Sequence, residues 1–264
     1  WLSALLDLVG YDAEREELIF YVGEADYQAE LNRRGFESSL EERQVGISAT
    51  MIRENPSCYW KYMAQPFRRH FTKKVLIMGS ASNGKTTLAK DLARYYDAPV
   101  SLEYAREYQI QNNVRDDELT PKDYYYLLLG QYAQTSRLID SNANRGLVVA
   151  DTNSLVTKAY YDYYLKESPV QDEETDTFDN LFASILSKEK WDLILFAEPV
   201  GTYVNDGFRD MSMADEAIRS DFSSYLKKLK EQYLPNHPTV YLAGSYLDNY
   251  EIAKEAINRI YQAD

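Results

Sequence analysis

Cysteine and histidine are scarce in the 264-residue chain, which holds one cysteine, Cys58, and two histidines. A single cysteine excludes both a disulfide within the chain and a zinc site built from cysteines. The same scarcity is typical of a reducing compartment, so we expect a cytoplasmic protein. Long apolar runs are also lacking: none approaches the roughly 18 residues that indicate a transmembrane helix, and we expect no membrane span.

Positive charge is the other shortage. The chain has 29 Lys and Arg residues against 42 Asp and Glu residues, a net charge of −13. Non-specific binding to nucleic acid needs a broad basic surface, so we expect no nucleic-acid partner. A small anionic ligand is not excluded, because a glycine-rich loop binds phosphate mainly through backbone N–H dipoles.

Tyrosine, in contrast, is abundant, with 24 residues and clusters at 124–126 and 160–164. Tyrosines on a helix commonly pack half-buried with the hydroxyl in water. We therefore interpret these clusters as packing surfaces rather than as a ligand cage.

The strongest motif is a phosphate-binding loop. The apolar run 75–78 is typical of a buried strand, residues 79–86 read G-S-A-S-N-G-K-T, and apolar residues then recur at helical spacing. Strand, G-x-x-x-x-G-K-[ST] and helix together form the context that a P-loop requires. We expect Lys85 to reach the β- and γ-phosphates of ATP and Thr86 to hold Mg²⁺. The expected cofactor-binding residues are Gly79, Ser82, Asn83, Gly84, Lys85, Thr86 and Thr87.

Charged residues follow the next expected strand. Glu103, Tyr104 and Arg106 lie at the end of a short strand at 100–104. Ligands of open α/β sheets bind beyond the carboxyl ends of the strands. There Glu103 would accept the proton of an attacking hydroxyl, and Arg106 would hold an anion. A surface helix start with solvated charges explains the segment equally well.

Two later apolar stretches also end near charged residues. The stretch 147–150 is followed by Asp151, an arrangement typical of the acidic Mg²⁺ ligand that accompanies a P-loop. The alternative role of Asp151 is a helix N-cap. Arg209 comes after the stretch 191–197, and we expect it on a lid that closes over the phosphates, the alternative being a solvated loop arginine.

Strands alternate with helices from residue 75 onward. This alternation predicts an α/β fold in which helices flank both faces of a parallel sheet. Upstream, Ser48 is placed to cap a short helix that carries Thr50 and Arg53. A helix N-terminus with these side chains is a candidate phosphate site, and an ordinary capped helix is the alternative.

Four sets of short motifs carry a family resemblance when they are taken together. They are I-S-A-T-M-I-R at 47–53, N-P-S-C-Y-W at 55–60 with P-F-R-R-H-F at 66–71, the P-loop with E-Y-A-R-E at 103–107, and D-T-N at 151–153 with D-G-F-R at 206–209. In order and spacing they resemble the NadR family, bacterial proteins that join a nicotinamide mononucleotide adenylyltransferase to a ribosylnicotinamide kinase. The chain departs from the family at Asn153, where a second Asp is frequent, and at Phe208, which replaces Leu.

The resemblance implies three parts. Residues 74–264 would form a P-loop kinase domain, 57–73 a bridge, and 1–56 the C-terminal part of a Rossmann-like nucleotidyltransferase domain. Ser48, Thr50 and Arg53 would be a remnant of its ATP-phosphate site. The H-x-G-H motif from the front of that domain is absent from this sequence, which begins at Trp1 rather than Met. We therefore expect residues to be missing upstream and no adenylyltransferase activity from the chain as given.

For the kinase domain, the resemblance implies Mg²⁺-assisted transfer of the γ-phosphoryl group of ATP to the 5′-hydroxyl of nicotinamide riboside. Glu103 is the expected base, with Asp151 as the competitor. Tyr104 and Arg106 would contact the substrate, and Arg209 would close over the transferring group. A P-loop NTPase, a kinase for another nucleoside and a nucleotide-sensing regulator are the alternatives. The motifs do not specify which base the acceptor carries. They also leave the oligomeric state undetermined, and a homo-oligomer is one of the alternatives.

Overall fold

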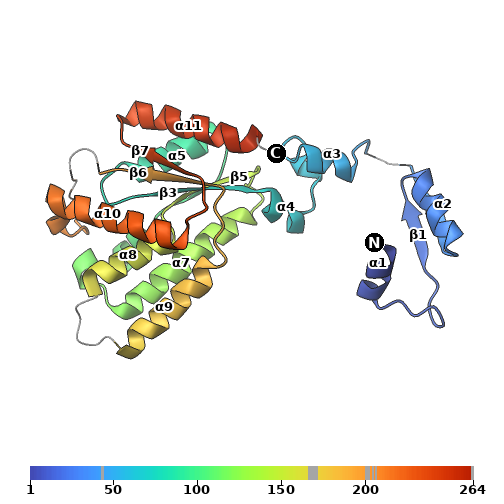
Figure 1. Cartoon of the computed structure of the whole chain (residues 1–264), viewed down its shortest axis with the longest axis horizontal. Coiled ribbons are helices and arrows are strands. Elements are labelled where there is room, and N and C mark those ends of the chain that lie inside the picture. Colours follow the sequence, from blue (N-terminus) through green and yellow to red (C-terminus); the bar gives the residue numbers. More distant parts are fainter. Residues whose placement is uncertain (43–44, 166–171, 200–202, 204, 206, 263–264) are drawn as a thin grey trace. The chain divides into compact units, whose positions relative to one another are not determined.

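The computed structural model describes residues 1–42, 45–165, 172–199, 203, 205 and 207–262 (Figure 1). The chain divides into two compact units, Trp1–Arg53 and Glu54–Asp264. None of the described helices is both long and apolar enough to cross a bilayer.

The first unit contains a small β-α-β arrangement. Its elements are α1 (Leu2–Val9), β1 (Ile19–Val22), α2 (Ala25–Arg33) and β2 (Glu37–Leu40), followed by α3 (Ala49–Glu54). β1 and β2 pair in parallel, with α2 as the crossover. Leu31 is fully buried, and the rings of Phe20 and Phe36 meet edge to face at 5.5 Å. This unit therefore has its own small apolar centre.

A five-stranded parallel sheet forms the centre of the second unit. In spatial order its strands are β4 (Val100–Ser101), β5 (Leu147–Asp151), β3 (Lys73–Met78), β6 (Leu193–Ala197) and β7 (Thr239–Leu242). Every neighbouring pair is parallel, which confirms the predicted fold class. Ile77 of β3 pairs with Asp151, and Met78 pairs with Phe196. The carboxyl end of β3 therefore lies between those of β5 and β6.

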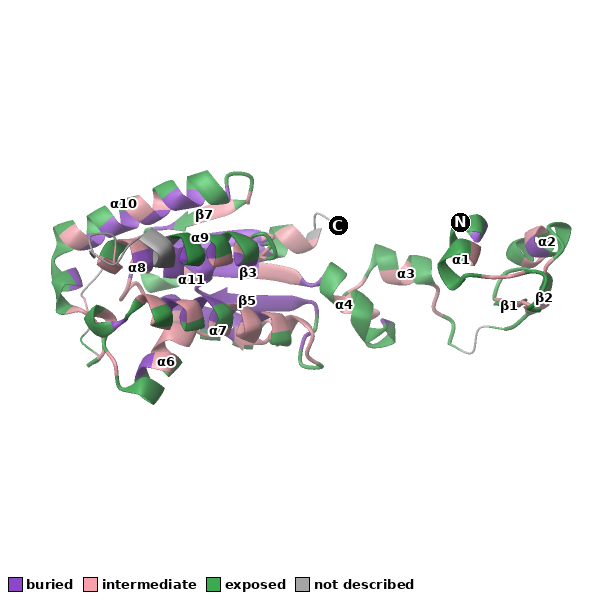
Figure 2. Cartoon of the chain, turned by 90° about the horizontal axis from the view of Figure 1, so that it is seen from below, coloured by how far each residue is buried: buried purple, intermediate pink, exposed green. Residues whose placement is uncertain are grey.

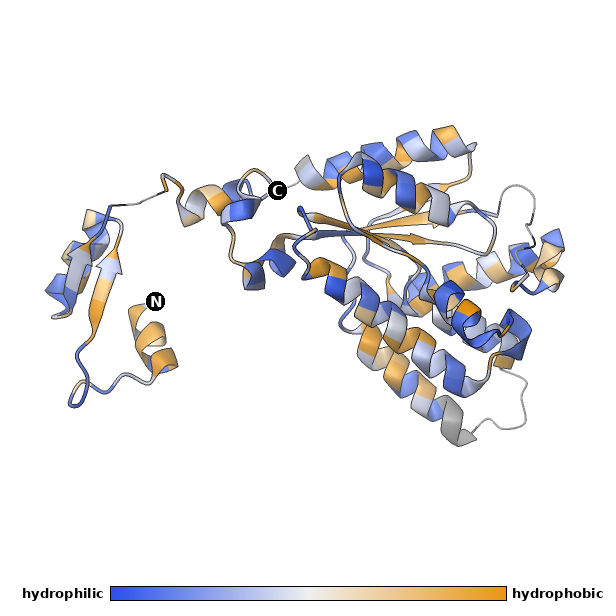
Figure 3. Ribbon diagram, turned by 180° about the vertical axis from the view of Figure 1, so that it is seen from behind, coloured by the Kyte–Doolittle hydropathy of each residue, from blue (hydrophilic) through white to orange (hydrophobic). Residues whose placement is uncertain are grey.

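Helices cover both faces of this sheet (Figures 1 and 3). They are α5 (Lys85–Tyr95), α6 (Tyr104–Asn112), α7 (Pro121–Ile139), α8 (Ser154–Leu165), α9 (Asp172–Leu186), α10 (Glu216–Tyr233) and α11 (Tyr246–Gln262), with short 3₁₀ turns η2 (Asp116–Glu118) and η3 (Met211–Ala214). Val75 and Ile77 of β3 pack with α5 and α11, whereas Leu76 and Met78 pack with α7 to α10. Successive side chains of a strand face opposite ways, so the apolar run of β3 serves two cores. Figure 2 shows the resulting buried centre.

The segment 57–73, expected as a bridge, lies within the second unit. It contains η1 (Trp60–Tyr62) and α4 (Gln65–Phe71). The buried Trp60 donates from Nε1 to the carbonyl oxygen of Asn144 at 2.6 Å, and Asn144 Nδ2 donates to Thr72 Oγ1 at 2.8 Å. These buried bonds attach the segment to the amino ends of β3 and β5.

Candidate active site

The loop between β3 and α5 has the backbone of a phosphate-binding loop. Gly79, Ser82 and Gly84 have positive φ angles of 145°, 63° and 73°. A Cβ on Gly79 would lie 2.3 Å from the carbonyl oxygen of Ala197, so only glycine lets the loop pass the end of β6 this closely. α5 begins directly after Gly84. The N–H groups and the positive dipole end of α5 are thereby available to an anion in the loop.

Two side chains brace this loop from within. Asn83 Nδ2 donates to Ser80 Oγ at 2.9 Å and to the carbonyl oxygen of Ala197 at 3.2 Å. Lys85 is buried, and its Nζ donates to the carbonyl oxygen of Ser80 at 2.7 Å. The ammonium group of Lys85 is therefore held against the loop, where a bound phosphate would replace a backbone carbonyl as its partner.

Thr86 and Asp151 form the second element of the site. Thr86 Oγ1 donates to Asp151 Oδ2 at 2.5 Å. Asp151 is fully buried, and among the described residues its Oδ1 has no hydrogen-bond partner. Burial raises the pKa of Asp151 to about 6, against the opposing effect of the Lys85 charge. A buried carboxylate oxygen without a partner is costly, so the pair fits a hard cation such as Mg²⁺.

Protein side chains alone would not complete such a cation site. Within the described part of the chain, no group of three or more His, Cys, Asp or Glu residues is arranged to hold a metal ion. Mg²⁺ is commonly bound by one or two protein ligands together with water and substrate phosphates. Phosphate oxygens and water would therefore supply the remaining ligands.

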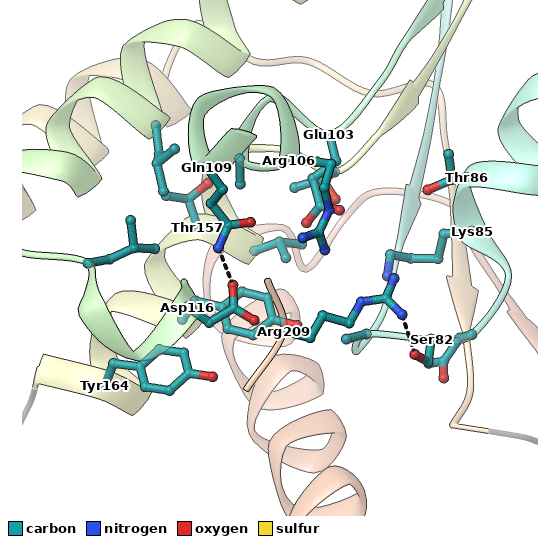
Figure 4. Close-up of a pocket in the computed structure, with 18 of the residues that line it drawn as sticks. Ser82, Lys85, Thr86, Glu103, Arg106, Gln109, Asp116, Thr157, Tyr164 and Arg209 are labelled. Carbon is teal, nitrogen blue, oxygen red and sulfur yellow. Dashed lines mark hydrogen bonds between the residues drawn. The ribbon is translucent and has the colours of Figure 1, made fainter. Parts of the chain in front are cut away.

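A cavity of about 360 Å³ opens from the loop. Figure 4 shows Ser82, Lys85 and Thr86 on one side of it, Gln109, Asp116 and Tyr164 on the other, and Glu103 and Arg106 between them. The predicted site residues that line this cavity are Ser82, Asn83, Gly84, Lys85, Thr86, Thr87, Glu103, Arg106 and Arg209. The structure thus brings together residues from the P-loop, α6 and the segment after β6.

Glu103 lies at the junction of the two sides. It is the residue immediately before α6 and lines the cavity, and its charge contributes to the raised pKa of Asp151. The guanidinium carbon of Arg106, one turn further along α6, lies 5.8 Å from the ring centre of Phe208. A carboxylate and a guanidinium at the start of one helix are therefore presented to the same space.

Arg209 reaches the P-loop directly. Its Nη1 donates to Ser82 Oγ at 2.6 Å. Asp206, the first residue of the D-G-F-R motif, lies outside the described residues. Arg209 therefore comes from a segment after β6 to the loop that follows β3, as a residue that closes over phosphates would.

Asp116, in η2, is a site residue that the sequence motifs did not identify. Gln109 Nε2 donates to its Oδ1 at 2.7 Å, and the backbone N–H of Asp210 donates to its Oδ2 at 3.1 Å. The backbone N–H of Asp116 donates to the carbonyl oxygen of Phe208 at 3.0 Å. Burial raises the pKa of Asp116. This carboxyl group therefore both faces the cavity and anchors the segment that carries Arg209.

Aromatic side chains form the walls around Asp116. Tyr124 of α7 and Tyr160 and Tyr164 of α8 line the cavity. They also pack, since Tyr160 and Tyr164 stack at 6.3 Å and Tyr124 meets Tyr161 edge to face at 5.4 Å. The interpretation of the tyrosine clusters as packing surfaces is therefore incomplete. The i, i+4 spacing of Tyr160 and Tyr164 was the available signal that both share one helix face.

Comparisons with known proteins agree with this geometry. A family model described as an AAA domain matches residues 74–246. A crystal structure of NadR protein in complex with NR is 38% identical, with a TM-score of 0.79 over 99% of this chain and 74% of that chain. The chain belongs to the NadR family. A NadR structure in complex with NAD and AMP-PNP is 36% identical, with a TM-score of 0.77. The resemblance expected from the motifs is confirmed.

Relatives of lower sequence identity show how much of a full-length NadR protein this chain spans and which other enzyme shares its fold. The trifunctional NAD biosynthesis/regulator protein NadR of Escherichia coli K12 is 26% identical over 238 residues, which cover 88% of this chain and 54% of that protein. The corresponding Salmonella typhimurium NadR matches 97% of this chain and 60% of its own length, so the chain spans little more than half of these relatives. Deoxyadenosine kinase from M. mycoides shares the fold, at 12% identity and a TM-score of 0.52.

One departure from the NadR motifs has a structural explanation. Asn153, where the family often has Asp, is not among the residues that line the cavity. Its Nδ2 donates to Glu189 Oε2 at 2.9 Å, and Ser154 Oγ donates to the same oxygen at 2.8 Å. An amide suits this position because it can donate to the carboxyl group that it faces.

Tyr104, expected to contact substrate, is likewise absent from the cavity lining. A Cβ on Gly130 of α7 would lie only 2.0 Å from the Tyr104 ring, so this ring packs on the glycine. Its backbone N–H donates to Gln131 Oε1 at 2.8 Å. These contacts attach the start of α6 to α7, and the substrate contact of Tyr104 stays a prediction.

Ser48, Thr50 and Arg53 belong to the first unit, whereas the P-loop residues belong to the second. Ser48 Oγ accepts from the backbone N–H of Met51 at 3.1 Å, and an Arg53 nitrogen donates to Thr50 Oγ1 at 3.2 Å. These are the bonds of a capped helix start, the alternative considered for this segment. The phosphate role of the three residues stays a prediction.

Proposed function

We propose that the chain is an ATP-dependent ribosylnicotinamide kinase, which transfers the γ-phosphoryl group of ATP to the 5′-hydroxyl of nicotinamide riboside. The observation that carries the proposal is the continuous cavity. The P-loop lies at one side of it, Glu103 in the middle, and an aromatic chamber lined by Tyr124, Tyr160 and Tyr164 at the other side. NadR relatives described in complex with NR and with AMP-PNP support the two substrates. An acceptor in the chamber would place its hydroxyl next to Glu103 and toward the phosphates.

In this mechanism ATP binds with its β- and γ-phosphates in the loop 79–86, against Lys85. Thr86 and Asp151 would hold Mg²⁺, which when bound offsets negative charge on the phosphate oxygens. The 5′-oxygen of the riboside forms a bond to the γ-phosphorus, and the bond from that phosphorus to the β,γ-bridging oxygen breaks. The hydroxyl proton passes to the Glu103 carboxylate, and ADP and nicotinamide mononucleotide result.

Arg106 and Arg209 would stabilise the transferring group. Both line the cavity, and Arg209 already touches the loop at Ser82. Fixed positive charge that meets the equatorial oxygens in the transition state supplies much of the rate enhancement in phosphoryl transfer. A hydrolytic NTPase would need a residue that orients water, whereas Glu103 lines a cavity of about 360 Å³, a volume in the range of small-molecule sites.

The test is ADP production from ATP and Mg²⁺ with nicotinamide riboside added or withheld. We expect turnover only with the riboside. Equal turnover without it would refute the kinase proposal and favour an NTPase. Turnover with other nucleosides but not with this riboside would refute the acceptor.

Two variants distinguish Glu103 from Asp151 as the base. Glu103→Gln should lower kcat by about 10²- to 10⁴-fold with little change in the Mg²⁺ requirement. Asp151→Asn should raise the Mg²⁺ concentration needed for half-maximal rate. Glu107→Gln is the matched control, since Glu107 lies on the same helix but is exposed. A Glu103→Gln enzyme with full rate would eliminate Glu103 as the base.

We also propose that residues 1–56 are the C-terminal part of a nucleotidyltransferase domain and that the chain acts in the cytoplasm. The parallel β1-α2-β2 unit supports the first part of this proposal. The sequence contains no H-x-G-H motif, so the chain should form no dinucleotide from ATP and nicotinamide mononucleotide. Release of pyrophosphate from that mixture would contradict this expectation.

A further inference from the structure

The chamber around Asp116 has an unusual charge arrangement. Both carboxylate oxygens of Asp116 accept from neutral groups, the Gln109 amide and the backbone N–H of Asp210. No Lys or Arg of the described residues forms an ion pair with it. Glu103 and Arg106 influence it from a distance with opposite signs. A buried carboxylate without a cationic partner is a costly arrangement that a positively charged ligand would relieve.

The tyrosine and leucine walls of the chamber do not supply that charge. Burial raises the pKa values of Tyr124, Tyr160 and Tyr164 further above 10, so their hydroxyls stay neutral and their rings keep electron-rich faces. Apolar side chains of Leu119 and Leu127 complete the lining. Aromatic faces together with one carboxylate make an environment that favours a delocalised cation.

One wall residue also indicates that a ligand belongs here. Tyr124 is 1% exposed and lines the cavity, and its hydroxyl has no hydrogen-bond partner among the described residues. Buried hydroxyls in folded proteins are normally paired. A ligand with a polar substituent on its ring would provide that partner.

We infer that this chamber selects its acceptor by the positive charge of the base ring, with Asp116 as the residue that determines the preference. The inference rests on the proposed function, because the pyridinium ring of nicotinamide riboside carries such a delocalised charge. Neutral nucleosides of similar size would leave the Asp116 carboxylate without a counter-charge, and they would bind more weakly.

The experiment compares two acceptors that differ in ring charge but share the ribose and the carboxamide. They are nicotinamide riboside, a cation, and 1,4-dihydronicotinamide riboside, which is neutral. The ratio of their kcat/KM values is measured for the wild-type chain and for Asp116→Asn by ADP production. The wild type should prefer the cation, and Asp116→Asn should lower that preference by about 10- to 100-fold, as expected for loss of one charge near the ligand.

A merely structural role of Asp116 predicts a different result. Asp116→Asn turns an accepting oxygen into a donor toward either Gln109 or the Asp210 N–H, which would disturb the segment that carries Arg209. That disturbance would reduce turnover of both acceptors alike and leave their ratio unchanged, and this outcome would overturn the inference. Asp116→Glu provides a second measurement, because it keeps the charge and should keep the preference even at a lower rate.

Asp117→Asn is the matched control. Asp117 lies in the same 3₁₀ turn, pairs with Arg115 at 3.3 Å and does not line the cavity, so the preference should stay at the wild-type value. Equal use of both acceptors by the wild type would overturn the inference but leave the kinase proposal intact. Failure of the wild type to phosphorylate either acceptor would refute the proposed function itself, and the inference with it.

Discussion

Replacement of Gly79 by alanine should destabilise the second unit severely. At φ 145° the backbone of residue 79 lies in a region that residues other than glycine rarely adopt, and the strain costs about 1–3 kcal/mol. The new Cβ would also lie 2.3 Å from the carbonyl oxygen of Ala197, which must move. Overpacking of this kind costs about a further 1–3 kcal/mol. The free energy of unfolding should therefore fall by about 2–6 kcal/mol.

Gly84→Ala is the matched comparison in the same loop. Gly84 also has a positive φ, 73°, but a Cβ there would meet no atom within 4 Å. Alanine in the left-handed region costs about 1–2 kcal/mol, and the reduced freedom of the unfolded chain offsets about 0.4–1 kcal/mol of that. Gly84→Ala should therefore cost about 0–1.6 kcal/mol in stability.

The assay is urea unfolding without nucleotide, followed by tryptophan fluorescence. Trp60 and Trp191 are buried in the second unit and report on it. The Gly79→Ala midpoint should lie well below that of Gly84→Ala. Equal losses of stability in the two variants would refute the reasoning, because they would show that close approach to Ala197 adds nothing to the backbone strain.

Three further predictions concern charged and polar groups. Lys85→Ala should lower kcat by about 10³-fold or more, since it removes the fixed positive charge that faces the transferring phosphates. The riboside-dependent ADP assay measures this, and a rate near that of the wild type would show that Lys85 is not a site residue. Burial raises the folded-state pKa of Asp116, so between about pH 4 and that raised pKa the native protein binds more protons than the unfolded chain. The free energy of unfolding should therefore fall as the pH rises through this range. Asp116→Asn should flatten this part of the urea-unfolding profile, and an unchanged slope would contradict the assignment. Asn153→Asp should lower the free energy of unfolding in urea by about 1–3 kcal/mol, because it would set a second carboxylate against Glu189. The double variant Asn153→Asp with Glu189→Gln should recover most of that loss. If it recovers nothing, the contact between residues 153 and 189 is not the cause.

The parts of the site that the sequence predicted are those encoded by neighbouring residues. The strand, loop and helix around Gly79 to Thr86 are contiguous, and each has a strong local signal in its apolar run, its glycines or its spacing. Asp151 was predicted as a Mg²⁺ ligand because it ends an apolar strand in a chain with a P-loop. The structure places it against Thr86 Oγ1, and its metal role stays a prediction. Glu103, Arg106 and Arg209 were predicted from their places after expected strands, and the family motifs agreed with that choice.

The acceptor side was not predictable because its contacts join distant segments. Asp116 belongs to a short turn between helices, and its role depends on Gln109 seven residues before it and Asp210 94 residues after it. The family resemblance implied that Tyr104 contacts substrate, and the closeness of Gly130 to its ring is a contact that no local pattern indicated. Such pairings follow from helix packing, and no local pattern in the sequence contains them.

The segment after β6 connects the two sides of the cavity through consecutive residues. Phe208 accepts from the backbone N–H of Asp116, Arg209 donates to Ser82 in the P-loop, and Asp210 donates to the Asp116 carboxylate. A backbone displacement of residues 208–210 would therefore change contacts at both sides of the cavity. The same short segment contacts the P-loop and the carboxyl group that lines the other side of the cavity.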